Sequence, residues 1–177
     1  MAVEIREVTT IKGLKKFIRY PLTLYKGSPY YVPNLFADEL NTLRADKNPA
    51  FEDARARYWM AYRENQAVGR VAAMIVPRHE EKWGEKYMRF GWIDFIDDAE
   101  VVKALMDTVE NWARQEGKLG VHGPLGFTDL DREGMLVEGF DAEELGTVLE
   151  REQARAEGVG NGALVALAVV ELAAPLV

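Results

Sequence analysis

The stretch Met88–Gly117, MRFGWIDFIDDAEVVKALMDTVENWARQEG, decides the fold because it predicts a buried strand, an acidic turn and an amphipathic helix in one run. We expect the strand over Phe90–Ile96, where apolar residues dominate, and the helix from about Asp98 to Glu116. The apolar stripe of this helix consists of Val101, Val102, Leu105, Val109, Trp112 and Ala113. Gly117 is the expected helix C-cap. Where a strand passes directly into a helix, α/β proteins commonly bind phosphate at the helix N-terminus.

The turn at this junction contains Asp97 and Asp98 and no glycine. We expect Asp97 to be the N-cap and Glu100 to complete a capping box at the third helical position. The chain's own carboxylates would then satisfy the first N–H groups of the helix and repel a pyrophosphate. We therefore favour structural capping over phosphate binding.

The rest of the chain predicts strands and helices that complete one domain. The first strand is expected at Val3–Val8, followed by a helix over Ile11–Tyr20 that Pro21 ends. A second helix is expected at Leu35–Arg44. The next expected elements are antiparallel strands at Arg57–Arg63 and Val68–Pro77, a loop at Arg78–Tyr87, and a strand at Leu119–His122 after the long helix.

The two strands of the hairpin have apolar residues on both faces, so we expect helices to cover both sides of the sheet. The order βααβββαβ predicts an α/β (α+β) fold with a mixed, mostly antiparallel sheet flanked by helices.

Composition excludes several classes of protein. The 177 residues are 48% hydrophobic and 29% charged, with no cysteine and a single serine, Ser28, outside any nucleophile motif. Disulfides, thiolate chemistry and serine hydrolysis are thereby excluded or disfavoured. His79 and His122 are the two histidines, and no metal-binding motif accompanies them, so we expect no metal.

The formal charge of −7 argues against general nucleic-acid binding. The chain has neither a spanning segment nor a signal peptide, so we expect a cytoplasmic location and no membrane partner. Lys12, Lys15, Lys16 and Arg19 form a basic cluster. Their spacing, with Leu14, Phe17 and Ile18 on the other side, is typical of the solvated face of a helix.

Composition changes after Phe140, since no aromatic residue follows it. We expect a domain over residues 1–146 and an atypical tail over 147–177. Ala142–Glu157 has helix-like spacing, and an apolar segment, Ala163–Val177, follows a glycine-rich break. This tail makes self-association a reasonable expectation.

The order of a β-hairpin, a strand, a helix and a further strand resembles that of the GNAT superfamily of N-acetyltransferases. Several local strings resemble a narrower group of bacterial GNAT-like proteins: Pro21–Tyr25 with Tyr31–Pro33, Lys47–Phe51, Ala61–Arg63 with Gly69-Arg70, Phe90-Gly91, Ile96–Asp98, Gly123-Pro124 and Gly134–Asp141. The resemblance covers about residues 3–146. It implies acetyl-CoA bound where two neighbouring parallel strands splay apart, and acetyl transfer to a small-molecule or peptide amine.

The resemblance places cofactor contacts at Phe95, Ile96, Asp97 and Asp98. The superfamily's Arg/Gln-x-x-Gly-x-Gly/Ala pyrophosphate loop corresponds to residues 96–101, and this chain lacks it. The resemblance implies that fuller relatives continue into a second GNAT-like half that carries the loop. We interpret the aromatic-free tail as a sign of truncation or a shifted reading frame, which the downstream nucleotide sequence would test.

Two residues are candidates for catalysis. Asp94 lies in an otherwise apolar strand, where burial would suit its carboxylate to act as a general base on an amine. The alternative, which we favour, is an ion pair with a neighbouring-strand arginine such as Arg70. His122 ends the next strand, where ligands approach, and is a candidate proton relay; a hydrogen bond to a turn is the favoured alternative. Two interpretations stay open: an acetyl-CoA-dependent N-acyltransferase and a non-catalytic GNAT-like binding or interaction module.

Overall fold

A six-stranded sheet with the strand order β1-β2-β3-β4-β5-β8 organises the chain. The computed structural model describes residues 2–84, 86–128, 131, 134–136, 165–166 and 168–171. The strands of this sheet are β1 (Glu4–Glu7), β2 (Arg55–Arg63), β3 (Gln66–Ile75), β4 (Tyr87–Phe95), β5 (Gly120–Gly123) and β8 (Ala168–Glu171). All neighbours run antiparallel except β4 and β5, which are parallel. The predicted mixed, mostly antiparallel sheet is thereby confirmed.

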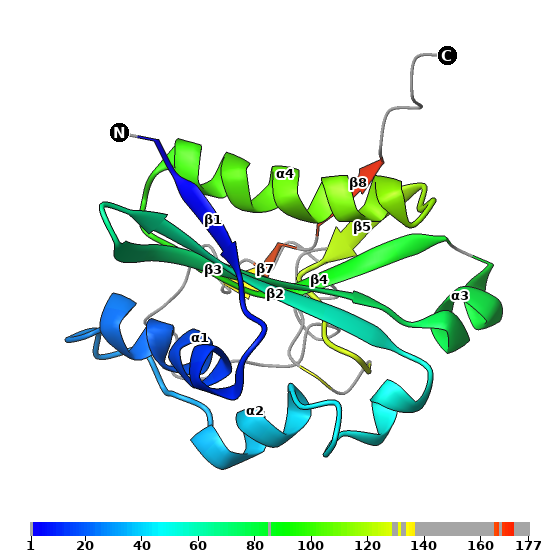
Figure 1. Ribbon diagram of the computed structural model, residues 1–177, viewed down its shortest axis with the longest axis horizontal. Helices are drawn as coiled ribbons and strands as arrows, with labels where there is room; N and C mark the ends of the chain where they lie inside the picture. The colour runs from blue at the N-terminus through cyan, green and yellow to red at the C-terminus, as the bar shows by residue number, and fades with distance from the viewer. Residues whose placement is uncertain are drawn as a thin grey trace, which may run out of the picture.

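Helices cover both faces of this sheet, as Figure 1 shows. The helical elements are α1 (Ile11–Leu24), α2 (Phe36–Thr42), the short 3₁₀ helix η1 (Pro49–Glu52), α3 (Pro77–Trp83) and α4 (Ala99–Gln115). Helix α4 lies on one face, and α1 and α2 lie on the other (Figure 1). A separate two-stranded sheet joins β6 (Met135–Leu136) to β7 (Val165–Ala166).

The β2–β3 hairpin explains why helices are needed on both sides. Its turn residues Glu64 and Asn65 have φ of 51° and 64°, the left-handed conformation that a two-residue hairpin turn requires. Trp59 and Ala61 of β2 belong to the core beneath α4, whereas Tyr58 and Met60 belong to the core beneath α1. Successive side chains of the strand point to opposite faces of the sheet, so β2 contributes to two hydrophobic cores, one on each face.

Helix α1 continues past the point where we expected it to end. It runs to Leu24 with Pro21 inside it, so the predicted end at Tyr20 was wrong. Proline has no N–H, so the carbonyl of Phe17, four residues earlier, loses its helical donor. The guanidinium of Arg70 in β3 replaces it, because Arg70 Nη1 donates to Phe17 O at 2.9 Å. A residue 53 positions away thus makes the proline tolerable within the helix.

The segment expected as a loop at Arg78–Tyr87 contains α3, so that prediction was wrong too. Pro77 stands in the first turn of α3, where its missing N–H costs nothing, and Gly84 at φ 69° ends the helix. The glycine stop of α4 is confirmed: Gly117 has φ 67°, and Lys118 N–H donates to Ala113 O at 2.9 Å. The helix-like pattern at 142–157 lies outside the described residues. Among the described helices, none has the length and apolarity to cross a membrane.

Candidate functional site

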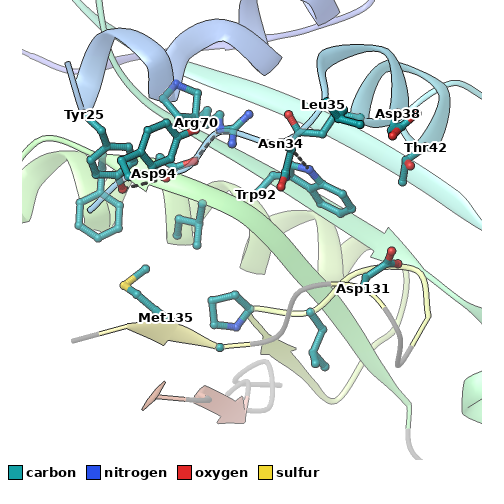
Figure 2. Close-up of a pocket in the computed structure, with 18 of the residues that line it drawn as sticks. Tyr25, Asn34, Leu35, Asp38, Thr42, Arg70, Trp92, Asp94, Asp131 and Met135 are labelled. Carbon is teal, nitrogen blue, oxygen red and sulfur yellow. Dashed lines mark hydrogen bonds and ion pairs between the residues drawn. The ribbon is translucent and has the colours of Figure 1, made fainter. Parts of the chain in front are cut away.

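A cleft of about 730 Å³ opens beside the C-terminal half of β4. Its walls come from the end of α1, the segment joining α1 to α2, α2 itself, residues 92–95 of β4 and the chain that follows β5. Figure 2 shows Tyr25, Asp94 and Arg70 grouped at one end, and Trp92, Asn34 and Asp38 toward the other. Apolar side chains such as Leu35 and Met135 line it together with these polar groups.

The cleft exists because β4 and β5 stop pairing halfway along β4. Their register ends at Arg89 and His122, although β4 continues to Phe95. Two glycines allow the chains to touch just where they separate. A Cβ on Gly91 would lie 2.3 Å from Leu125 O, and one on Gly123 would lie 2.2 Å from Phe90 O. The N–H of Leu125 donates to Phe90 O at 2.7 Å, and beyond this contact the two segments splay apart.

An irregularity in β4 accompanies the separation. Trp92 has φ 45°, and the register between β3 and β4 shifts between Arg70 and Ala72. A bulge of this kind turns side chains onto a new face and increases strand twist. Trp92 is turned into the cleft as a result, where its indole N–H donates to Glu39 Oε1 at 3.1 Å.

A hydrogen-bond network forms one end of the cleft. It starts at the carbonyl of Phe17 in α1, which Pro21 leaves without a helical donor. Arg70 is 5% exposed, and its Nε donates to Asp94 Oδ2 at 2.7 Å while its Nη1 donates to Phe17 O. The Tyr25 hydroxyl donates to the other carboxylate oxygen, Asp94 Oδ1, at 2.9 Å. The favoured alternative for Asp94, an ion pair with Arg70, is confirmed. Since both carboxylate oxygens accept hydrogen bonds, the geometry makes Asp94 a positioning residue for Tyr25.

The hydroxyl of Tyr25 stays protonated under ordinary conditions. Burial raises the pKa of Tyr25, and the neighbouring Asp94 carboxylate raises it further both by its charge and by accepting the hydrogen bond. The Tyr25 ring lies 4.7 Å from the Tyr31 ring, centroid to centroid. These contacts fix a phenol at the cleft wall, where its oxygen can accept a hydrogen bond from a ligand while its O–H donates to Asp94.

The charges that line the cleft are mostly negative. Among the described lining residues, four are carboxylates, Asp38, Glu39, Asp94 and Asp131, and one is a guanidinium, that of Arg70. Arg70 is already paired with Asp94. Glu39 accepts hydrogen bonds from Trp92 and from Asn34 Nδ2, the latter at 3.0 Å. The cleft therefore presents acceptors and negative charge to a ligand.

The start of α4 lies at the turn that follows β4, and it differs from the prediction by one residue. The N-cap is Asp98 and not Asp97: Asp98 Oδ1 accepts from Glu100 N at 2.9 Å and from Val101 N at 3.3 Å. The strand-like pairing extends through Ile96, whose N–H donates to Val68 O, which delays the helix by a residue. Glu100 is then too early in the helix to reach back, so the capping box was also wrong.

Arg63, at the end of β2, binds the two carboxylates at the start of α4. Its Nη1 donates to Asp98 Oδ2 at 2.7 Å, and its Nη2 donates to Glu100 Oε2 at 2.8 Å. The Arg63 guanidinium holds the pKa of Asp98 below its usual range, helped by the backbone N–H groups that Asp98 caps. The carboxylate therefore keeps its charge at the end of the helix.

Of the site residues predicted from the sequence, some line the cleft and others do not. Asp94 and Phe95 line the cleft, whereas Ile96, Asp97, Asp98 and His122 are absent from its described lining. Val121 packs in the core beneath α4, so alternation points His122 to the other face of the sheet, in register with Arg89. His122 is therefore on the same face of the sheet as α1, but it is not among the described residues that line the cleft with Asp94. In the described residues, no group of three or more acidic or histidine side chains could hold a metal ion.

Sequence reasoning missed Tyr25, Glu39 and Trp92 as cleft residues. Tyr25 is the last residue of the string Pro21–Tyr25, one of those that carry the family resemblance. Its place in that string was the one signal that could have marked it as a site residue. The sequence gives no sign that Glu39 and Trp92 meet, because a bulge that no local pattern predicts turns Trp92 toward α2.

The arrangement of sheet and helices has a counterpart among solved structures. A tandem GNAT protein from the clavulanic acid biosynthesis pathway superposes with a TM-score of 0.52 at 15% identity, over 88% of this chain and 43% of that one. The chain has the GNAT fold. The GNAT-like fold expected from the sequence is thereby confirmed, including the parallel pair of strands that splays apart.

Two curated bacterial proteins are similar in sequence. Protein YghO of Escherichia coli is 36% identical over 137 residues, which are 77% of this chain and 35% of that protein. A bacterial ceramide synthase of Caulobacter vibrioides is 33% identical over 137 residues, 76% of this chain and 35% of that protein. No protein-family model matches the chain. The chain spans about a third of the length of the curated relatives it matches.

Proposed function

We propose that this chain is a GNAT-fold unit of an amine N-acyltransferase and that it holds the amine acceptor rather than acyl-CoA. The observation that carries the proposal is the self-capped start of α4. Asp98 takes up the N–H groups of Glu100 and Val101, and Arg63 is bound to the carboxylates of Asp98 and Glu100.

Acetyl-CoA does not fit this junction. The family resemblance places the pyrophosphate on the N–H groups that follow β4, and a pyrophosphate needs those donors unoccupied. Here Asp98 occupies two of them, and Asp97, Asp98 and Glu100 add negative charge at the same place. Each close pair of like charges costs on the order of 1 kcal/mol even in a water-like medium. The residues at this junction therefore disfavour acetyl-CoA binding in this chain.

The cleft suits a cation with an apolar portion. An aliphatic amine, with a pKa near that of lysine at about 10.4, is protonated at neutral pH. Its ammonium group would be attracted to the carboxylates of Asp38 and Glu39, and its chain would contact apolar walls such as Leu35 and Met135. The Tyr25 oxygen and the carboxylates supply the acceptors that ammonium protons require.

The names of the relatives are compatible with this class of ligand. One relative is called a ceramide synthase, and a ceramide is by chemical definition a fatty amide of a long-chain amino alcohol. A long-chain amine is thus both the acceptor that such a name implies and the ligand that the cleft chemistry favours. Because the chain spans a third of those relatives, acyl transfer itself is proposed for a longer protein of which this fold is one unit.

The test uses a matched series of ligands with one chain length. Dodecylamine, dodecanol and dodecanoate are titrated against the chain, and the fluorescence of Trp92 in the cleft reports binding. The amine should bind most tightly, the alcohol less tightly and the carboxylate least. Trp92→Phe should remove the fluorescence change, and Asp38→Asn with Glu39→Gln should remove the preference for the amine. Equal binding of all three ligands would overturn the proposal.

A second candidate, acyl-CoA binding in the same chain, is favoured by the backbone of β4. Ile96 N–H donates to Val68 O at 3.0 Å, and Phe95 is opposite Gly69 in the register. Because bonded and non-bonded pairs alternate in an antiparallel ladder, Phe95 directs its own N–H and C=O away from β3, to the side where β5 has separated. A pantetheine arm could hydrogen-bond there.

Calorimetry with acetyl-CoA separates the two candidates. The first predicts no binding at millimolar cofactor. If binding occurs and becomes tighter in a variant with Asp97→Asn and Asp98→Asn, the phosphates lie at the start of α4 and the second candidate holds. Binding that these changes leave unaltered would place the phosphates elsewhere and would still overturn the first candidate.

A further inference from the structure

Residues 11–35, which form α1 and the segment leading to α2, differ in charge from the rest of the chain. They contain Lys12, Lys15, Lys16, Arg19 and Lys26 and no acidic residue, whereas the whole chain has a net charge of −7. In α1 these cations are exposed, while Leu14, Phe17 and Ile18 are buried against the sheet. Every charged side chain on the outer face of the helix is therefore a cation.

These five cations lie in one continuous segment and have no carboxylate partner in the described part of the chain, a property that only isolated cations such as Lys47 and Lys86 share. Elsewhere in the described part of the chain, most Lys and Arg side chains form ion pairs with carboxylates of neighbouring strands, helices and turns. None of the five pairs with a carboxylate anywhere in the described part of the chain. Arg19 lies 4.5 Å from the centroid of the Phe36 ring and contacts no carboxylate. Although the chain is rich in acidic residues, the cations of this segment are not paired with carboxylates in the described part of the chain.

Large exposed apolar side chains gather in the same segment. Seven are exposed in the described residues, and six of them belong to this stretch: Ile11, Leu22, Tyr25, Tyr30, Val32 and Leu35. Val32 and Leu35 are each 73% exposed. Exposed apolar side chains that cluster next to positive charge are the composition of surfaces that bind at a membrane interface.

The position of the segment links it to the cleft. Helix α1 lies on the face of the sheet opposite α4 (Figure 1). Tyr25, Tyr30 and Leu35 line the cleft as well as being exposed. The mouth of the cleft therefore borders the cationic and apolar surface, and a ligand entering from that side would pass along it.

We infer that residues 11–35 dock onto an anionic lipid bilayer. The cations of α1 contact the headgroups, and the apolar residues of the segment after α1 enter the interface. Each lysine or arginine close to an anionic membrane strengthens binding roughly fivefold, and apolar insertion adds to this. This inference departs from the expectation of no membrane partner, which rested on the lack of a spanning segment, because a peripheral contact needs no such segment. The inference does not depend on which ligand the cleft holds.

Vesicle co-sedimentation tests the inference with the whole chain. Phosphatidylcholine vesicles, alone or containing phosphatidylglycerol, are compared across a range of salt concentrations. We expect binding that needs the anionic lipid and weakens as salt rises. A variant with Lys12→Gln, Lys15→Gln and Lys16→Gln should bind at least about tenfold more weakly. The matched control, Lys47→Gln with Lys86→Gln and Lys103→Gln, removes three cations elsewhere and should bind within about twofold of the unmodified chain.

A second pair of variants tests the apolar part. Leu22→Ser with Val32→Ser should weaken binding to anionic vesicles, while Leu119→Ser, which changes an exposed leucine at the other side of the fold, should not. All these side chains are exposed, so the circular dichroism of each variant should match that of the unmodified chain. No preference for anionic vesicles, or equal losses in the test and control variants, would overturn the inference. Binding to RNA in solution as tight as to vesicles, unaffected by Leu22→Ser with Val32→Ser, would also overturn it.

Discussion

Two arginine–carboxylate pairs lie near the end of β4, and they have the same length but different surroundings. Arg70 and Asp94 are joined at 2.7 Å with side chains 6% and 16% exposed, whereas Arg63 and Asp98 are joined at 2.7 Å with side chains 26% and 25% exposed. The first pair is enclosed between α1 and the sheet and satisfies a carbonyl that Pro21 leaves without a donor. The second is partly exposed to solvent and lies at the start of α4, where Asp98 caps the helix.

The difference shows that burial, not pairing distance, decides what such a pair does. The buried pair orders the cleft wall, because removing either partner would leave a charge without compensation. The half-exposed pair contributes little to stability, but it fills the donors that a phosphate would need. One junction at the end of β4 thus opens into a cleft, while the adjacent junction is closed by a helix cap.

The largest expected effect comes from breaking the buried pair. Arg70→Met leaves Asp94 buried without its cation and Phe17 O without a donor, so it should lower the free energy of unfolding by about 3 to 5 kcal/mol. Urea denaturation measures this. Arg63→Met is the matched control at the half-exposed pair, and its loss should stay within about 1 kcal/mol. Equal losses in the two variants would mean that burial does not distinguish the pairs.

The same two pairs show which features of the fold local sequence patterns can predict and which depend on tertiary packing. Local patterns predicted α4 with its glycine stop, the β2–β3 hairpin and the two covered faces of the sheet, because periodicity and turn residues determine them. They could not predict that α1 continues through Pro21, since the replacement donor Arg70 is distant in the chain and comes close only through sheet packing. The N-cap was misplaced because Asp97 and Asp98 are equally good caps, and the choice depends on how far β4 pairs with β3. The cleft depends on the bulge at Trp92, which leaves no local signature.

The next effect concerns the glycine at which the strands separate. Gly91→Ala would place a Cβ 2.3 Å from Leu125 O, a backbone atom that cannot move without shifting the segment after β5. We expect a loss of about 1 to 3 kcal/mol from this overpacking, measured by urea denaturation. Gly84→Ala serves as the control: its φ is 69° and no atom lies within 4 Å of the added Cβ. It reports the cost of a left-handed backbone alone, about 1 to 2 kcal/mol. If Gly91→Ala is neutral, the strands separate at another position.

A smaller effect decides which aspartate caps α4. Asp98→Ala removes the acceptor for Glu100 N and Val101 N and should cost about 1 kcal/mol. Asp97→Ala removes a neighbouring carboxylate that makes no capping bond in the structure and should be nearly neutral. Comparing the midpoints of thermal unfolding for the two variants tests the assignment, and a larger loss for Asp97→Ala would restore the cap that the sequence predicted.

The smallest effect is the dependence of the cap on pH. Arg63 holds the pKa of Asp98 below its usual range, so the folded state binds this proton less readily than the unfolded state does. Stability from this group is therefore present above the unfolded pKa of about 3.9 and is lost as the pH falls through the lower folded value.

Asp98→Asn isolates this dependence, because asparagine caps a helix about as well as aspartate but does not titrate in this range. The difference in unfolding free energy between the unmodified chain and Asp98→Asn should favour the unmodified chain near pH 6 and shrink as the solution is acidified. Other carboxylates with lowered pKa, such as Glu7 beside Arg57, are common to both proteins and cancel in the difference. Repeating the comparison in an Arg63→Met background should flatten it, since the cation that lowers the pKa is then gone. A difference that persists unchanged in that background would mean that the helix N-terminus alone, and not Arg63, holds the charge on Asp98.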